Sequence, residues 1–281
     1  MTDSIIITID DNKVEANTNE TIWEVASRNG IQIPHLCHKP ADGYRPDGNC
    51  RACMVEIDGE RTLAASCIRY ASEGMVIKTE SERATKARNM VLELLVTDQP
   101  SQVDAHDPAS TLWHFANAVE INHSRFPQHT APQPDSSHPA IAVNMDACIQ
   151  CGLCVRACRE VQVNDVIGLA GRGPNAHIVF DLGDDMGAST CVGCGECVQA
   201  CPTGALMPKA SLDENGVFAN KPDRQVDSLC PYCGVGCQLT FNIKDDKILS
   251  VDGRPGPANR GRLCVKGRYG FDYIHNKDRL T

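Results

Sequence analysis

The sequence has 281 residues, of which 42% are hydrophobic but only 5% aromatic, and 16 are cysteines. This length predicts two or more domains, and so thin an apolar core is expected to need further stabilisation, such as bound metal. The formal net charge of -9 argues against nucleic acid or an anionic membrane surface as the main partner.

No segment predicts export or a membrane span. The N-terminus lacks a basic region followed by a long apolar stretch, and no stretch approaches the roughly 20 apolar residues of a spanning helix. We therefore expect a soluble, cytoplasmic protein. Cysteines in a reducing compartment are not expected to form disulfides, so metal ligation is the default interpretation of their number.

The chain opens with the pattern of a hairpin followed by a helix. Residues 5–9 and 14–16 are strand-like segments on either side of a turn. Thr21 and Glu24 form a capping box at the start of a helix that is expected to end at Gly30.

Three more strands are expected before residue 80. Residues 54–57 and 61–64 flank Asp58-Gly59, which is a hairpin signal, and residues 75–79 supply another strand. Together with the opening hairpin and helix, this order resembles a plant-type ferredoxin β-grasp. We therefore expect such a domain over residues 1–80.

A first set of four cysteines in this domain has the spacing C-x12-C-x2-C-x13-C. Gly48 and Asn49 precede its second cysteine and suit a loop whose amides point at bridging sulfides. Ligands spread in this way fit a 2Fe-2S centre, and a zinc site is the weaker alternative. The members of the set are Cys37, Cys50, Cys53 and Cys67.

Residues 81–140 contain no cysteine and predict a helical segment followed by a Pro-rich linker. Asp107-Pro108 suits the N-cap and first position of a helix running toward Ile121, with His106 and His114 nearby. Three further histidines lie among prolines, and we expect them to be solvated linker residues and not metal ligands. These are His123, His129 and His138.

Residues 141–222 contain two copies of the spacing C-x2-C-x2-C-x3-C. Three thiolates at this spacing wrap one loop around a cluster while the fourth reaches the other cluster, as in two-cluster bacterial ferredoxins. Zinc is the weaker alternative, because its sites usually combine two separated C-x2-C pairs. We expect two 4Fe-4S centres, one with Cys148, Cys151, Cys154 and Cys201, the other with Cys191, Cys194, Cys197 and Cys158.

A fourth set, within residues 223–281, has the spacing C-x2-C-x3-C-x26-C and predicts a third 4Fe-4S centre. It comprises Cys230, Cys233, Cys237 and Cys264, and the four sets together account for all 16 cysteines. Some basic residues within two positions of a ligand are candidates for offsetting the thiolate charge, with ordinary surface charge as the alternative. They are Arg51, Arg156, Arg159 and Lys266.

In this order, the modules resemble the N-terminal half of the large subunit of NAD-dependent molybdenum or tungsten formate dehydrogenases. The most specific segments are CIQCGLCVRACREVQVNDVIG at 148–168, SLCPYCGVGCQL at 228–239 and GRLCVKGRYGFDYIH at 261–275. The same architecture occurs in the peripheral-arm subunit of respiratory complex I and in iron-only and NAD-reducing hydrogenases.

The resemblance implies a modular α+β fold: a β-grasp 2Fe-2S domain, a helical linker, a two-cluster ferredoxin module and a small 4Fe-4S domain that opens a molybdopterin oxidoreductase. Relatives carry a further cluster held by one His and three Cys. It cannot form in its usual way here, because no cysteine lies between Cys67 and Cys148. Relatives also continue into a molybdopterin body, whereas this sequence ends at Thr281, so we expect the formate site and the Mo/W-bis-pterin next to this chain and not within it.

We therefore expect a one-electron relay between a pterin-bound metal in a molybdopterin catalytic domain or subunit and a flavin/NAD diaphorase partner. The resemblance makes Lys266, in the C-x-K-G pattern, the electron-link candidate between the last cluster and the pterin. No catalytic residue is expected in this chain. The alternatives are a relay subunit of a hydrogenase or of a complex I-like NADH oxidoreductase, and a non-redox zinc scaffold.

Overall fold

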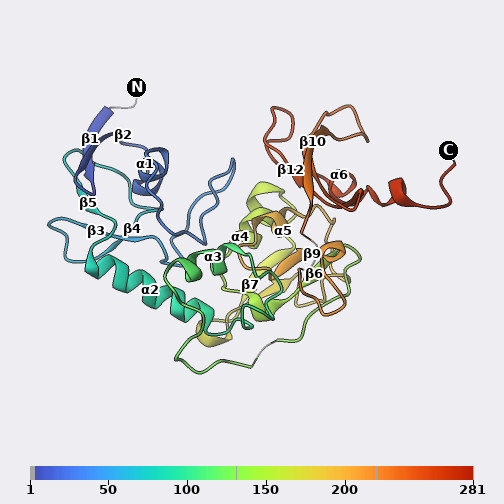
Figure 1. Ribbon diagram of the computed structural model, residues 1–281, viewed down its shortest axis with the longest axis horizontal. Coiled ribbons are helices and arrows are strands. Elements are labelled where there is room, and N and C mark those ends of the chain that lie inside the picture. The colour runs from blue at the N-terminus through green and yellow to red at the C-terminus, as the bar shows by residue number, and fades with distance from the viewer. Residues whose placement is uncertain (1–3, 131, 219–220, 281) are drawn as a thin grey trace. The chain divides into compact units, whose positions relative to one another are not determined.

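The computed structural model describes residues 4–130, 132–218 and 221–280. The chain forms two compact units, and the segments of both can be followed by colour in Figure 1. Unit 1 comprises Met1–Lys39, Arg45–Asp98 and Thr111–His129, and unit 2 comprises Pro40–Tyr44, Gln99–Ser110 and Thr130–Thr281. The short loop Pro40–Tyr44 therefore belongs to unit 2, although its neighbours in sequence belong to unit 1.

Unit 1 is built on a five-stranded sheet with the order β2-β1-β5-β3-β4. Its strands are β1 (Ser4–Ile9), β2 (Asn12–Asn17), β3 (Met54–Ile57), β4 (Ala64–Ala65) and β5 (Val76–Lys78). Among the described strands of this sheet, β1 and β5 pair in parallel and the other neighbours pair antiparallel. Ile5, Ile7 and Ile9 alternate into the core while Ile6 is 46% exposed, which is the two-residue period of a half-buried strand.

The predicted hairpin and first helix are confirmed. β1 and β2 pair antiparallel around a turn at Asp10 and Asp11, which both have positive φ. Helix α1 (Ile22–Arg28) has the predicted capping box: the Thr21 side chain accepts from the Glu24 N–H, and the Glu24 carboxylate accepts from the Thr21 N–H. Gly30, with a φ of 77°, lies just beyond its end.

The strand predicted at 61–64 is wrong in extent, whereas the one predicted at 75–79 is confirmed as β5. The turn expected at Asp58-Gly59 is present, because the Glu60 N–H donates to the Ile57 carbonyl at 3.0 Å and Gly59 has a φ of 79°. β4, however, pairs only Ala64 and Ala65 with β3, directly before Ser66 and Cys67. The Ser66 N–H and hydroxyl both donate to the Cys53 carbonyl, at 3.1 and 2.8 Å.

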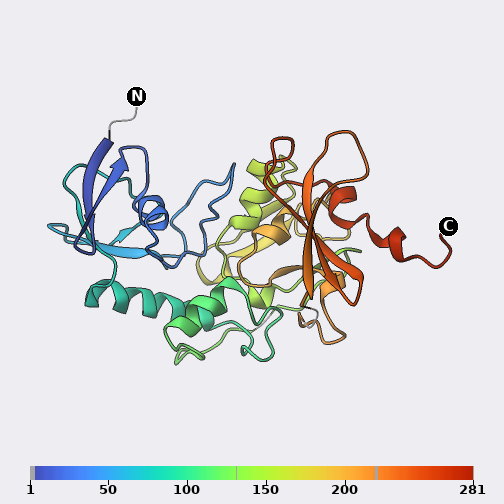
Figure 2. The same ribbon diagram turned by 45° about the horizontal axis from the view of Figure 1, so that its top comes forward.

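Helices α2 (Glu82–Val96) and α3 (Thr111–Ala118) pack together in unit 1, and α2 also contacts β3, as the teal and green ribbons of Figure 2 show. α2 lies within the helical segment expected over residues 81–140, although its bounds were not predicted. α3 corresponds to the helix expected after Asp107-Pro108, but it starts later. The Asp107 carboxylate accepts from the Ala109 N–H at 3.0 Å, which closes a local turn before the helix begins.

Unit 2 combines short helices with three separate sheets. The pairs are β6 (Ile141–Val143) with β9 (Leu206–Pro208) and β7 (Ile167–Ala170) with β8 (His177–Phe180), and the third sheet is β10 (Arg224–Leu229), β11 (Gln238–Lys244) and β12 (Lys247–Gly253). The helices are α4 (Leu153–Arg156), the π-helical η2 (Ala157–Val161), α5 (Glu196–Ala200) and α6 (Val265–Tyr269). Short 3-10 turns are η1 (Met145–Ala147), η3 (Gly173–Asn175), η4 (Lys209–Ser211) and η5 (Asp272–His275). The chain is thus mixed in helix and strand, and none of the helices in its described residues is long and apolar enough to cross a membrane.

Candidate metal centres

In unit 1 the structure brings together the four cysteines of the first predicted set, all of them buried. Hydrogen bonds from Cys50 and Cys67 to the sulfur of Cys37 lower the pKa of Cys37, and bonds to Cys37 and Cys53 raise the pKa of Cys67. The N–H groups of Asn49 and Cys50 also point at the Cys37 sulfur, the latter at 3.4 Å. This loop therefore presents amides to the sulfur of a proposed ligand, and the predicted contact of its amides with bridging sulfides stays a prediction.

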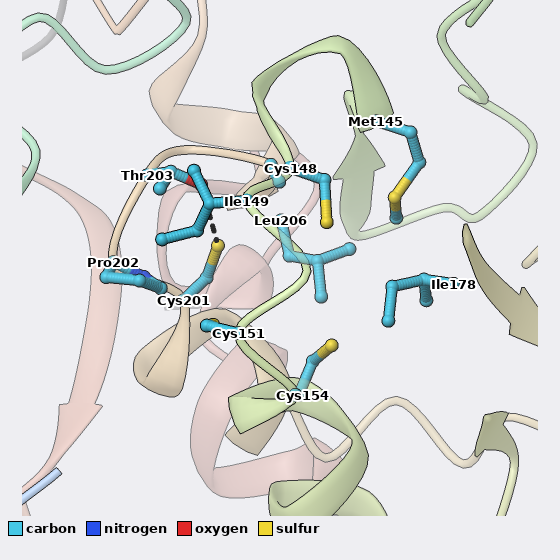
Figure 3. Close-up of a pocket in the computed structure, with 12 residues that line it drawn as sticks. Met145, Cys148, Ile149, Cys151, Cys154, Ile178, Cys201, Pro202, Thr203 and Leu206 are labelled. Carbon is cyan, nitrogen blue, oxygen red and sulfur yellow. Dashed lines mark hydrogen bonds between the residues drawn. The ribbon is translucent and has the colours of Figure 1, made fainter. Parts of the chain in front are cut away.

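In unit 2, four cysteines and apolar side chains line one pocket (Figure 3). Cys148, Cys151 and Cys154 come from the loop before α4 and its first turn, and Cys201 ends α5. In Figure 3 the sulfurs of Cys148, Cys154 and Cys201 surround the same space. The apolar lining includes Met145, Ile149, Ile178 and Leu206.

Burial and backbone donors shape the chemistry of this first pocket. The Gln150 N–H donates to the Cys148 sulfur at 3.4 Å, and the Thr203 hydroxyl oxygen lies 3.6 Å from the Cys201 sulfur. Burial raises the pKa of Cys148 to about 11 and raises the pKa of Cys151 further. A thiolate at this depth therefore requires a cationic partner, and bound iron satisfies that requirement.

The lining of a second pocket includes Cys158, Cys191, Cys194 and Cys197. The Val166 N–H donates to the Cys158 sulfur at 3.3 Å, and the Gly193 N–H donates to the Cys191 sulfur at 3.4 Å. Each pocket thus collects three cysteines of one run and the fourth of the other. The structure groups these residues as the crossed sets require, and their role as ligands stays a prediction.

The two runs leave their clusters by different backbone routes. Cys201 ends α5 because Pro202 follows it and cannot continue a helix. Cys158 is followed by Arg159 and lies inside the π-helical turn η2. A π turn inserts one extra residue per turn and is common at functional sites. It here takes the chain onward from Cys158 without a proline.

The last four cysteines lie around one end of the β10–β12 sheet. Cys230, Cys233 and Cys237 occupy the connection from β10 to β11, and Cys264 is the N-cap of α6. Burial raises the pKa of Cys237, and the charges of the other three cysteines raise it further. The Cys230 N–H donates to the Cys237 carbonyl at 2.8 Å, which closes the connection between the two strands. Cys233 and Cys264 are exposed, so this is the most open of the four sets.

His106 is engaged on both ring nitrogens in unit 2. Nδ1 lies 2.9 Å from the Gly216 carbonyl oxygen, and Nε2 lies 2.9 Å from an Asp146 carboxylate oxygen. The hydrogen bond to Asp146 raises the pKa of His106. The ring therefore joins the Asp146 side chain to the backbone at Gly216, two places far apart in sequence.

The prediction that the linker histidines are solvated holds for His123 and His129 but is wrong for His138. His138 is only 7% exposed, and its Nδ1 accepts from the N–H groups of Ala140 and Ile141, at 3.2 and 3.1 Å. The buried ring thus satisfies the backbone at the start of β6. His114 is exposed on α3. Within the described ranges, no group of three or more His, Cys, Asp or Glu side chains is arranged to hold a single metal ion.

The basic residues near the ligands occupy very different environments. Arg51 and Lys266 are exposed, and Arg159 is exposed in an ion pair with Asp165. Arg156, at the end of α4, is only 3% exposed. Arg156 is therefore the candidate that the structure brings into the interior.

Two buried charged residues beside the ligands were not predicted. Glu196 lies between Cys194 and Cys197 and is 2% exposed, and Arg268, one turn after Cys264, is 3% exposed. A carboxylate inside an otherwise apolar ligand loop is a signal that sequence inspection could have used.

Three parts of the chain match known domain families. Residues 2–82 match a 2Fe-2S iron-sulfur cluster binding domain, residues 144–205 a 4Fe-4S dicluster domain, and residues 223–276 a molybdopterin oxidoreductase Fe4S4 domain. The chain therefore contains iron–sulfur, electron-transport domains of the kind found in oxidoreductases.

Several curated proteins are similar over nearly the whole chain. An NADH-quinone oxidoreductase component of Rhizobium meliloti (strain 1021) is 33% identical over 98% of this chain and 32% of its own length. Putative formate dehydrogenase YrhE of Bacillus subtilis (strain 168) is 29% identical over 99% of this chain and 32% of its own length. The chain thus spans about a third of the length of these relatives. A solved NAD+-reducing NiFe hydrogenase in the H2-reduced state matches with a TM-score of 0.65 and 29% identity, over 74% of this chain and 88% of that one.

Proposed function

We propose that this chain is the iron–sulfur electron relay of an NAD-linked oxidoreductase. The observation that carries the proposal is the grouping of the two duplicated cysteine runs around two separate pockets, each with three cysteines from one run and one from the other. Chance spacing does not gather four thiols from two distant segments around one apolar space. A cluster with four thiolate ligands requires that arrangement.

The proposed ligation follows the four predicted sets. Cys37, Cys50, Cys53 and Cys67 hold a 2Fe-2S cluster. The first pocket holds a 4Fe-4S cluster through Cys148, Cys151, Cys154 and Cys201, and the second holds one through Cys158, Cys191, Cys194 and Cys197. Cys230, Cys233, Cys237 and Cys264 hold the last 4Fe-4S cluster.

When bound, such clusters accept and release single electrons. The protein contributes the surroundings. Backbone N–H groups donate to the sulfurs of Cys37, Cys148, Cys158 and Cys191, which stabilises the thiolate form of each side chain. Apolar residues such as Ile178 and Ile167 exclude water from the two pockets of unit 2. Donors and burial of this kind set the potential of a cluster.

On a finer level, we propose a cytoplasmic formate dehydrogenase in which this chain passes electrons between a Mo- or W-bis-pterin in an adjoining catalytic domain and a flavin/NAD diaphorase partner. The Fe4S4 domain match and the similarity to putative formate dehydrogenase YrhE support this assignment. Lys266 is exposed directly beyond Cys264, and we propose it as the electron link from the last centre toward the pterin.

A second candidate is a relay subunit of an NADH oxidoreductase or hydrogenase complex. The similarity to the Rhizobium meliloti NADH-quinone oxidoreductase component and to the NAD+-reducing hydrogenase favours it. A non-redox zinc scaffold is the third candidate, and metal content separates it from the other two.

Metal analysis of the purified chain tests the relay itself. One 2Fe-2S and three 4Fe-4S centres require about 14 iron atoms per chain, whereas a zinc scaffold requires about four zinc atoms. Purification of the native complex tests the finer assignment. Formate-dependent reduction of a dye, with molybdenum or tungsten and pterin present, supports the formate dehydrogenase. Hydrogen- or NADH-dependent reduction in a complex without pterin favours the second candidate.

A further inference from the structure

One buried ion pair joins two of the proposed centres in unit 2. Arg268 lies on α6, the helix that Cys264 caps, and its backbone N–H donates to the Cys264 carbonyl at 3.0 Å. Its side chain reaches the other ligand loop, where Nε donates to the carbonyl of Cys194 at 3.3 Å. A single residue thus contacts the backbone of a ligand from each of two cysteine sets.

The carboxylate that faces Arg268 comes from within the second ligand loop. Nη2 of Arg268 lies 3.7 Å from Oε2 of Glu196, and both side chains are 3% exposed. The Tyr44 hydroxyl donates to the other Glu196 oxygen at 2.7 Å, and Nη1 of Arg268 donates to the Val251 carbonyl at 3.0 Å. Asp252 is the remaining acidic partner, 3.7 Å from Nη1, and its side chain is half exposed.

The close approach of α6 to this loop depends on glycine. Gly195 has a φ of 70°, and a Cβ there would lie 2.9 Å from Cγ and 3.0 Å from Nε of Arg268. Gly193 is similarly close to α6, because a Cβ there would lie 3.2 Å from Val265. The loop therefore leaves room for the guanidinium and for the helix that carries it.

Stability alone does not explain why a guanidinium is buried here. Removing two charged groups from water costs free energy, and the attraction between them often fails to recover that cost. Well-packed apolar residues in the same place frequently give equal stability. Thiolate-bound centres, however, are net anionic, and reduction adds a further negative charge. A buried cation beside them favours the reduced form, and the low local dielectric strengthens the effect.

From these contacts we infer that Arg268 is a shared positioning residue that holds α6 against the Cys191–Cys197 loop and raises the reduction potentials of both adjoining centres. Glu196 opposes part of that charge at the centre held by the loop. The inference rests on the proposed ligation, and it distinguishes the buried Arg268 from Lys266, which is exposed two residues after Cys264.

Redox titration monitored by low-temperature EPR tests the inference on the cluster-loaded full chain. Arg268→Met is expected to shift the midpoint potentials of the Cys191–Cys197 centre and of the last centre to more negative values, with the Cys148 centre as internal reference. Arg268→Lys keeps the charge and is expected to restore most of both potentials. Lys266→Met is expected to shift the last centre alone.

Glu196→Gln is nearly isosteric and keeps the inference testable where Arg268→Met fails to fold. It removes a negative charge and is expected to shift the Cys191–Cys197 centre to a more positive potential. Arg224→Met is the matched control, because Arg224 is an exposed cation paired with Asp246. It lies at the start of β10, whereas Cys230 follows the last residue of that strand. Arg224→Met is expected to leave all potentials unchanged.

Iron content distinguishes a failure of the proposed ligation from a failure of the role assigned to Arg268. A parent chain that fails to load four clusters contradicts the proposed ligation. Fully loaded Arg268→Met and Glu196→Gln chains whose potentials match the parent within error overturn the role of Arg268 and leave the ligation intact. A shift confined to the last centre in Arg268→Met also overturns it, because the shared role requires both.

Discussion

His106 ties three segments of unit 2 together through one ring. It contacts Asp146, 40 positions away, and the Gly216 carbonyl, 110 positions away. Both partners are acceptors, so the doubly protonated ring can donate to both at once. Because Asp146 lies two residues before Cys148, this bond also anchors the entry to the first ligand loop of the unit.

We expect His106→Gln to destabilise the chain in a pH-dependent way. Asp146 raises the pKa of His106 above its ordinary value of 6.5, so the protonated ring favours the folded state. This contribution is fully present below the unfolded-state pKa and is lost as the pH rises through the raised folded-state pKa. The variant should lose about 1 kcal/mol, or about 2–4 °C in melting temperature, near pH 6 and much less near pH 9.

Thermal melts of parent and variant across this pH range check the prediction. His114→Gln is the control, because His114 is an exposed histidine on α3, and it should melt like the parent at every pH. An equal loss for His106→Gln at both ends of the range would show that packing, and not charge, is what the ring contributes.

At the scale of residues, local spacing was enough to predict which cysteines gather, because each ligand loop is short and the duplication suggests the crossing. Local spacing did not predict the burial of Arg268 or Glu196. The burial of Glu196 depends on Tyr44, 152 positions away, and that of Arg268 on the Cys194 carbonyl, 74 positions away. His138 is a similar case, because the strand whose backbone it caps gives no signal in the Pro-rich segment before it.

At the scale of elements, side chains of α6 pack closely against the backbone of the Cys191–Cys197 loop. A Cβ at Gly195 would lie 2.6 Å from the Tyr269 hydroxyl oxygen, so the Tyr269 side chain or the loop would have to shift. Gly236 offers a matched position next to another proposed ligand. Its φ of 72° is almost the same, but nothing lies within 4 Å of its added Cβ.

We therefore expect Gly195→Ala to be more damaging than Gly236→Ala. Both substitutions carry the left-handed backbone penalty of about 1–2 kcal/mol, and only the first adds a clash worth about 1–3 kcal/mol. The difference should appear as a lower melting temperature and as lower iron content in the centres on either side of α6. Equal losses in the two variants would mean that α6 is not docked on this loop.

The second ligand loop and η2 make the crossed ligation testable. Cys158 lies on η2 but faces the pocket of Cys191, Cys194 and Cys197. Cys158→Ser should therefore perturb the EPR spectrum and potential of that centre first, and Cys201→Ser should perturb the Cys148 centre first. If each substitution instead altered the centre of its own run, the two loops would bind clusters independently and the proposed pairing would be wrong.

Elements were predictable where a local signal stood alone, as in the capping box of α1. The bounds of an element were missed where a tertiary contact masked the pattern. The buried face of α2 repeats at Ala84, Arg88, Leu92 and Val96, so a charged residue interrupts its apolar period. Arg88 is tolerated there because its guanidinium donates to the carbonyls of Met54 and Thr79 and pairs with Glu80. Both carbonyls lie outside α2, so the sequence pattern of the helix does not predict these hydrogen bonds.

At the scale of the whole molecule, the cysteine sets account for the thin apolar core noted in the sequence. The core of unit 1 includes Cys53 and Cys67, and the small core of Leu239, Val251, Leu263 and Phe271 has Cys230 and Cys237 packed against it. Proposed ligands thus occupy places that apolar side chains fill in ordinary domains. Cluster loading and folding are therefore expected to be coupled in this chain.

The assignment of every cysteine to one of four sets predicts four centres and not five. All 16 cysteines belong to the four sets. His106, which lies between residues 81 and 140, already has Asp146 and Gly216 as partners of its two ring nitrogens. Stepwise reduction of the loaded chain, followed by integrated low-temperature EPR, should therefore account for one 2Fe-2S and three 4Fe-4S spins. Asp146→Ala frees the His106 ring and should still yield only four. A fifth spin with a nitrogen-ligand signature in the parent chain would contradict this count and make His106 a ligand.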